Sequence, residues 1–234
     1  MSEIELELQR QIIDLRNQID VLKMIQVKNS IYGWLRDSDT WVYVSATQFK
    51  ITGKDVTARF PVGTKIKLTQ TTTKYFYVVA TAFSTDTTVT ITGGSDYNLA
   101  NAAITDPCYS YVETPQGFPG YFNWVPTLTG FSVNPSGVYR FSMSGKKVNG
   151  YVTQNADGTS NAITFSISLP FTIAIGGQPV GSIRFWDGGA PSATLGICEV
   201  TTTVFNLYTS GAGAGWSTTG YKAAHFNFSM YASL

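Results

Sequence analysis

The sequence predicts a mainly β protein with an N-terminal coiled-coil helix, a small antiparallel β-barrel domain and a C-terminal β-sandwich with jelly-roll-like wiring. Three observations indicate this fold. Apolar residues follow a heptad only within the first thirty positions, and apolar and polar residues alternate over much of the remainder. Segments rich in glycine and proline separate two β regions. With 234 residues, 43% of them apolar, the chain is long enough for two compact cores beside the helix.

The N-terminal heptad predicts self-association. Its apolar positions are spaced by four and three residues, and they are Leu8, Ile12, Leu15, Ile19 and Leu22. A single helix of this length is marginal in water, so we expect copies of the chain to associate in parallel through residues 3–28. The alternative is a helix that folds back onto its own globular body. Isoleucine at a with leucine at d favours a dimer, but three clean heptads leave the number of strands open.

The rest of the chain divides into a neck, two β domains and a hinge. Residues 1–41 are expected to form the helix and a neck in which Ile31, Trp34 and Trp41 pack, with a connector from residue 29. Residues 42–113 predict the small barrel, with a central strand at 75–80 buried on both sides and one helical turn within 97–104. Residues 114–127 hold three prolines and two glycines, which predicts a packed hinge.

Residues 128–234 predict the β-sandwich. The clearest alternation of apolar and polar residues is at 163–169 and 225–231. Further strands are expected at 138–143, 147–153, 179–186 and 195–208. This number of short strands with turn-rich connections is typical of a sandwich.

Several stretches resemble a module of tailed-bacteriophage minor tail and tail-fibre proteins. They are the runs 60–70 (FPVGTKIKLTQ), 74–79 (KYFYVV) and 88–97 (TVTITGGSDY). The segment 109–119 is similar to the hinge that closes that module, and 216–222 with the following strand is similar to the last strands of those proteins. The resemblance implies a homotrimeric virion appendage, fixed to the particle by its N-terminal end and presenting a distal β domain to the host.

The chemistry-bearing residues argue against an enzyme. His225 is the only histidine, so neither a metal site nor a cofactor is expected, and a surface or interface position is predicted for its imidazole. Beyond residue 120 the only acids are Asp157, Asp187 and Glu199, which leaves at most one pair for glycoside cleavage. Asp187 lies in a Trp-Asp-Gly-Gly turn, where we expect it to cap its own backbone.

Net charge, cysteine content and hydropathy predict the binding partners and the localisation of the protein. A formal net charge of +1 provides no field for nucleic acid or an anionic membrane. Cys108 and Cys198 are expected to be free thiols, with a single bridge as the alternative. The sequence shows no signal peptide and no apolar membrane span, which predicts synthesis in the host cytoplasm and assembly into a virion.

Binding is the predicted use of the distal loops. Trp186 with Asp187 and Trp216 with Tyr221 place large aromatic rings beside glycines, an arrangement suited to a sugar face and its hydroxyls. The same rings are also typical of packing contacts. We therefore expect a tail fibre whose distal domain binds a host-surface glycan. The alternative is a neck or collar fibre, or a capsid decoration protein, without host contact.

Overall fold

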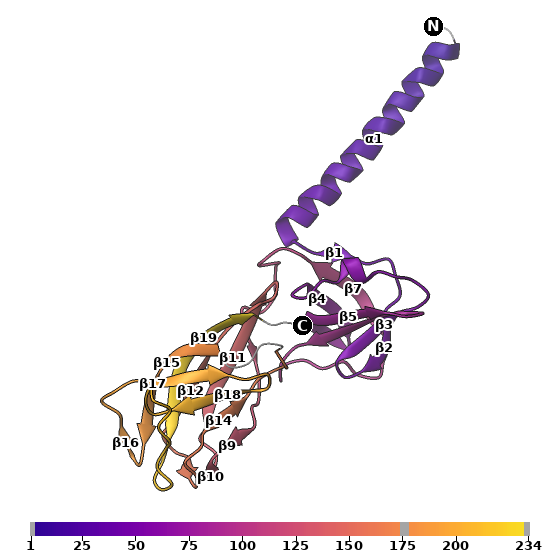
Figure 1. Cartoon of the computed structure of the whole chain (residues 1–234). Helices are drawn as coiled ribbons and strands as arrows, with labels where there is room; N and C mark the ends of the chain where they lie inside the picture. Colours follow the sequence, from indigo (N-terminus) through magenta and orange to yellow (C-terminus); the bar gives the residue numbers. More distant parts are fainter. Residues whose placement is uncertain (1–2, 174–177, 232–234) are drawn as a thin grey trace.

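The computed structural model describes residues 3–173 and 178–231, without the side chains of residues 25–31, 178 and 179. The chain is mainly β, with one long N-terminal helix and curled antiparallel sheets (Figure 1). The helix, α1 (Glu3–Tyr32), extends away from both β domains. This confirms the predicted fold class at the level of a mainly β chain with a helix at its N-terminus.

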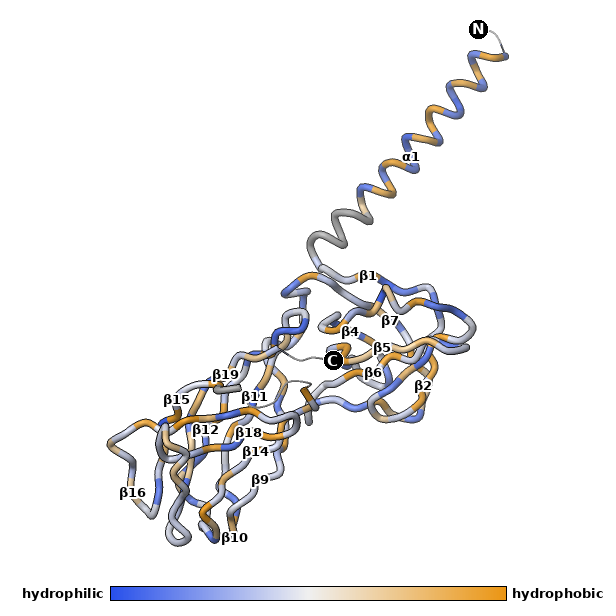
Figure 2. The backbone as a smooth tube through the Cα atoms, viewed as in Figure 1, coloured by the Kyte–Doolittle hydropathy of each residue, from blue (hydrophilic) through white to orange (hydrophobic). Residues whose placement is uncertain are grey.

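The side chains of α1 that would form the heptad contact lie in solvent. The exposed fractions of Leu8, Ile12, Leu15, Ile19 and Leu22 lie between 42% and 64%. Figure 2 shows hydrophobic and hydrophilic residues alternating along the coloured, N-terminal part of α1. The alternative of a helix folded back onto its own β domain is therefore wrong for the described side chains. The apolar heptad is left without a partner in the single chain.

The first β domain is a seven-stranded sheet with the order β1-β7-β4-β5-β6-β3-β2, and all its pairs are antiparallel. Within the described residues the edge strands β1 and β2 do not pair with each other, so the sheet is curled rather than closed. The elements are β1 (Leu35–Arg36), β2 (Val42–Ser45), β3 (Gln48–Ile51), the 3-10 helix η1 (Thr57–Arg59), β4 (Lys65–Gln70), β5 (Thr72–Phe83), β6 (Thr87–Thr92) and β7 (Thr105–Ser110).

The predicted helical turn within residues 97–104 is wrong. Tyr97 forms an isolated β-bridge with Gly93, and bends follow it. The side-chain amide of Gln70 supplies the hydrogen bonds instead. Its Nε2 donates to the carbonyls of Ala100 and Ala102 at 2.9 and 3.0 Å, and its Oε1 accepts from the Ala100 amide at 2.9 Å. A buried side chain from β4 therefore fixes this segment, so that no helical turn is needed.

The neck is shorter than predicted, because α1 continues to Tyr32 and β1 begins at Leu35. Trp34 is buried there, as expected. Its Nε1 donates to the carbonyl of Gln116 at 2.8 Å, a contact with the hinge that was not predicted. The position predicted for Trp41 is wrong. Its ring stacks on Phe49 inside the first core, with centroids 4.3 Å apart. The side chain of Ile31 lies outside the described residues.

The second β domain consists of two facing layers that share one long strand. Its strands are β8 (Phe122–Asn123), β9 (Leu128–Thr129), β10 (Phe131–Val133), β11 (Gly137–Ser144), β12 (Lys147–Gln154), β13 (Thr159–Ser160), β14 (Ser166–Ser168), β15 (Gln178–Asp187), β16 (Ala190–Pro191), β17 (Gly196–Val200), β18 (Val204–Tyr208) and β19 (Ala223–Tyr231). Ten of them form one sheet in the order β8-β11-β12-β19-β15-β17-β18-β14-β9, with β16 paired to β15, and β10 pairs with β13.

Strand β15 passes from one layer to the other. Its first half pairs with β17, and residues Arg184–Trp186 pair with β19. A register shift lies between Pro179 and Gly181, which is where an extended strand can bend. The ring of Phe205 in β18 contacts Phe226 and Phe228 in β19, with centroids 5.4 and 4.9 Å apart, so the two layers enclose one core. The predicted strands at 138–143, 147–153 and 225–231 are confirmed. The strand predicted at 163–169 is shorter than expected, because only Ser166–Ser168 form β14 and Ile163 is 63% exposed.

Strand β5 joins the cores of the two domains. Phe76 and Val78 face the core of the first domain, while Tyr77 and Val79 belong to the core of the second. All four are buried, so the prediction of a central strand covered on both sides is confirmed. The hinge residues Phe118 and Phe122 pack on Tyr77, with centroids 5.0 and 5.3 Å away. The hinge is therefore packed, as predicted, and it also contains β8.

Candidate functional site

Trp186 lies half-exposed at the end of β15, in contact with two side chains of the same sheet face. The Arg184 guanidinium carbon is 5.0 Å from the centroid of the indole ring, and the His225 ring centroid is 4.7 Å from it. The Nε2 of His225 lies 2.8 Å from the carbonyl oxygen of Gln154. Because a carbonyl only accepts, this nitrogen donates, and the imidazole Nδ1 is left for another partner.

Asp187 does not cap its own turn, which corrects the prediction for this residue. Its carboxylate accepts the Ser217 amide at 2.9 Å and the Ser217 hydroxyl at 3.1 Å. The two residues are thirty positions apart, and their bonds tie the β15–β16 turn to the loop before β19. The amide of Gly189 in the same turn donates to the carbonyl of half-buried Tyr221 at 3.2 Å.

Trp216 lies beneath this turn, inside the core. Its side chain is 3% exposed, and its ring contacts Phe165 and Phe185 at centroid distances of 4.9 and 5.1 Å. Its Nε1 donates to the carbonyl of Leu207 at 2.7 Å. A ring that is enclosed in this way, with its one donor occupied, offers nothing to a sugar. Of the four residues expected to bind a ligand, Trp186, Asp187 and Tyr221 thus surround the β15–β16 turn, and Trp216 supports it from below.

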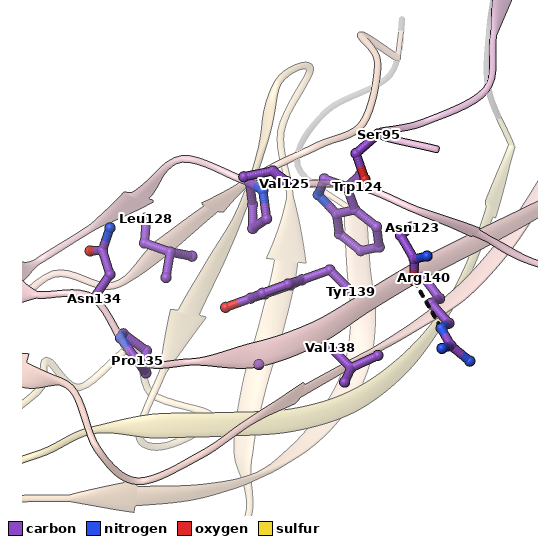
Figure 3. Close-up of a pocket in the computed structure, with 12 residues that line it drawn as sticks. Ser95, Asn123, Trp124, Val125, Leu128, Asn134, Pro135, Val138, Tyr139 and Arg140 are labelled. Carbon is purple, nitrogen blue, oxygen red and sulfur yellow. Dashed lines mark hydrogen bonds between the residues drawn. The ribbon is translucent and has the colours of Figure 1, made fainter. Parts of the chain in front are cut away.

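A groove of about 430 Å³ lies beside the edge of β11, and the sequence did not predict it (Figure 3). Trp124 and Tyr139 form its floor, and Val125, which is 83% exposed, stands at its rim. The Tyr139 hydroxyl accepts a hydrogen bond from Gln154 at 3.0 Å, and burial raises the pKa of this phenol. The only signal in the sequence was a pair of prolines, Pro126 and Pro135, close to apolar residues.

The acidic residues of the second domain have different surroundings. Asp157 accepts hydrogen bonds from the amide and hydroxyl of Ser136, and these bonds lower the pKa of its carboxyl. Asp187 is held by Ser217 as described above. Glu199 lies on β17, next to buried Cys198, whose thiol pKa is raised by burial. Both cysteines are free, in different sheets, which confirms the prediction for them.

The part of the chain that the structure describes offers neither a metal cluster nor a membrane-length helix. It contains no group of three or more His, Cys, Asp or Glu side chains that could hold a metal ion. Among the same residues, no helix combines the length and the apolar character that a membrane span requires.

No family model matches the chain, and no match was found among the curated proteins or the solved structures. The resemblance to phage tail-fibre modules therefore depends on the stretches quoted from the sequence, and it stays a prediction.

Proposed function

We propose that this protein is a homotrimeric tail fibre or tail appendage of a bacteriophage virion, whose distal β domain binds a glycan of the host surface. In this proposal α1 forms a parallel coiled coil with two other copies and with proteins of the virion. The second domain is a sandwich with jelly-roll-like wiring. Nucleic acid, membrane insertion and catalysis play no part in this function.

The observation that carries the proposal is the free α1 helix. Its five apolar heptad residues are each at least 42% exposed. Burying them between copies removes apolar surface from water, and this is the gain that a lone helix lacks. The turn between β15 and β16, with Trp186, lies at the end of the molecule far from α1 (Figure 1). A bundle of α1 helices would therefore place three such turns together on one side, where weak sites gain avidity.

The mass of the full-length protein in solution tests self-association. We expect mass photometry to give three times 25.5 kDa. The double variant Ile12→Asp, Ile19→Asp is expected to give a single-chain mass and to lose helical circular dichroism, because charged residues at a positions open the seam. Ile13→Asp is the matched control, since Ile13 is 58% exposed but lies outside the seam, and it is expected to stay trimeric. A single-chain mass for the unmodified protein would refute the proposal.

Two experiments test host attachment against a purely structural role. The full-length protein, added before the phage, is expected to reduce adsorption of virions that carry it. Immunogold labelling of the same virions is expected at the tail. Label at the neck or on the capsid, together with unchanged adsorption, would identify the protein as a collar fibre or a decoration protein.

A further inference from the structure

The outward side of β11, β12, β19 and the end of β15 forms a cationic surface, which we term the basic face. It is defined by Arg140, Lys147, Tyr151, Arg184, Trp186 and His225. The strand register places Arg184 opposite His225, and Arg140 opposite Tyr151. The alternate residues of the same strands, such as Phe185 and Phe226, are buried in the core, so the basic face points to solvent.

The basic face has no acidic side chain of its own. Strands β11, β12 and β19 contain no Asp or Glu, and the one carboxylate of β15, Asp187, is bonded to Ser217. Another carboxylate, Asp96, lies beyond the β8 edge. It accepts hydrogen bonds from the backbone and side-chain nitrogens of Asn123, both at 2.8 Å. The face therefore carries uncompensated positive charge.

The cations of the basic face differ from four cations of the first domain. There, Arg36, Lys50, Lys54 and Arg59 each form an ion pair with an aspartate. Among the described residues, neither Arg184 nor Lys147 forms any ion pair, and Arg140 donates only to neutral groups, the Asn123 amide oxygen and the Tyr151 hydroxyl. These three positive charges are thus available to an anion from outside the chain.

Arg184 is the best placed of the three. Its guanidinium packs over the Trp186 ring, which restrains it while leaving its N–H groups without a hydrogen-bond acceptor among the described residues. A planar guanidinium held in this way binds a carboxylate through two parallel hydrogen bonds. His225 lies directly opposite Arg184, and Asn227 lies two residues further along β19 on the same face. The Nδ1 of His225 and the side-chain amide of Asn227 can therefore form hydrogen bonds with hydroxyl groups of a bound ligand.

The spacing of the charges indicates what kind of polyanion fits. Along β19, the distance from His225 to Tyr231, which is paired with Lys147, is about 20 Å. Three cations over this span are far fewer than the phosphates of a nucleic acid strand, which carries one charge about every 3.4 Å. Neutral polar groups, such as Asn149 and Asn227, occupy the positions between them. The pattern suits a sparsely charged polymer that is rich in hydroxyl groups.

We propose that the basic face binds an acidic polysaccharide in which a uronic acid alternates with neutral sugars, its carboxylate held by Arg184. This inference rests on the proposed function and specifies its ligand class and its site. A second copy of the chain is a poorer occupant, because pressing two such faces together would oppose like charges.

Binding of defined polymers to the full-length protein tests the proposal. The probes are hyaluronan, which alternates a uronic acid with a neutral sugar, neutral dextran of similar length, and an oligothymidylate. At low salt we expect biolayer interferometry to detect hyaluronan binding that is stronger than binding to either other probe and is weakened by added salt. Arg184→Gln is expected to weaken it about tenfold, because a charged hydrogen-bonding partner is lost. Arg36→Gln removes an exposed cation from the first domain and is expected to change nothing.

Four results would overturn the proposal: no hyaluronan binding, equal binding to dextran, stronger binding to oligothymidylate, or an unchanged affinity in Arg184→Gln. A change of oligomeric mass in Arg184→Gln, without a change in hyaluronan affinity, would identify the face as a contact between copies. These outcomes are separable from failure of the proposed function. A trimer that blocks adsorption but binds only dextran refutes the acidic ligand alone, whereas a single-chain mass refutes the trimeric appendage.

Discussion

Two buried charged residues, Lys222 and Asp37, are compensated in different ways. Lys222 has no exposed surface, and its ammonium donates to the carbonyls of Ala162 and Thr164 at 2.9 and 2.8 Å. The rings of Phe131 and Phe165 lie 4.9 and 5.6 Å from it. Asp37, by contrast, is buried against the guanidinium of Arg59. Neither environment is visible in the sequence, because these carbonyls, rings and guanidinium all come from distant parts of the chain.

Lys222 is expected to make stability depend on pH in the alkaline range. Burial lowers the pKa of its ammonium from 10.5 to about 8, with Asp187 acting weakly in the opposite direction. Below pH 8 both folded and unfolded chains hold the proton. Between pH 8 and 10.5 the unfolded chain binds more protons, so the free energy of unfolding rises with pH, by about 3 kcal/mol from this group.

Urea unfolding at about pH 7 to 10, the interval that brackets this change of protonation, measures the rise. Lys222→Met lacks the titrating group, so the difference between the two proteins isolates its contribution from that of the tyrosines. If the free energy of unfolding changed with pH in the same way in both proteins, the predicted contribution of Lys222 would be wrong.

Asp37 is expected to be the most sensitive carboxylate of the first domain. Arg59 Nη1 lies 2.7 and 2.8 Å from its two oxygens, and Trp41 Nε1 donates to it at 2.9 Å. Asp37→Asn leaves the half-buried Arg59 with less compensation, and we expect a loss of about 2–3 kcal/mol in the free energy of unfolding. Asp106→Asn removes the exposed partner of Arg36 and is expected to cost less than about 0.5 kcal/mol. Chemical denaturation of both variants checks this, and equal losses would contradict it.

At the scale of elements, the turn at Gly94 fixes the first domain against β8. Gly94 has φ +61°, and a Cβ atom there would lie 1.9 Å from the carbonyl oxygen of Asn123. That oxygen accepts the amide of Ser95 at 2.7 Å. The turn therefore needs glycine for two reasons, its backbone conformation and its contact with the hinge.

Alanine substitutions of Gly53 and Gly94 separate the cost of the backbone conformation from the cost of the contact with Asn123. Gly53 has φ +68°, and a Cβ atom added there would have no other atom within 4 Å, so Gly53→Ala is expected to cost only about 1 kcal/mol of conformational strain. Gly94→Ala must also displace Asn123, and we expect it to cost about 3 kcal/mol or more. Unfolding by urea, followed by tryptophan fluorescence, measures both, and equal costs would show that the contact with Asn123 does not constrain the turn.

At the scale of the whole molecule, the shared strand β5 predicts that the two β domains unfold together. Tyr77 is 2% exposed and reaches from a strand of the first sheet into the core of the second domain. Tyr77→Ala is expected to lower the free energy of unfolding by about 3 kcal/mol and to shift a single calorimetric transition. Tyr231→Ala, at a site 72% exposed, serves as control and is expected to have little effect. Two separate transitions in the unmodified protein would contradict a joined core.

Local periodicity predicted the strand at 225–231, and the dense apolar run at 75–80 predicted a strand covered on both faces. The equally clear alternation at 163–169 failed in part, because only Ser166–Ser168 form a strand and Ile163 is 63% exposed. The heptad of α1 predicts self-association, because the spacing of its apolar positions is a property of the sequence alone. Local periodicity carries this information, since the period of two residues in a strand or of about 3.6 in a helix follows from backbone geometry alone.

The contacts between distant segments could not be predicted from the sequence. Gln70 replaced the expected helical turn at 97–104, Ser217 captured the carboxylate of Asp187, and the core enclosed Trp216. The basic face arises in part in the same way, because β19 pairs with both β12 and β15 and so brings Arg184 to the same sheet face as the hairpin of β11 and β12. Such contacts depend on the pairing of strands that lie far apart in the chain, and neither composition nor periodicity specifies that pairing.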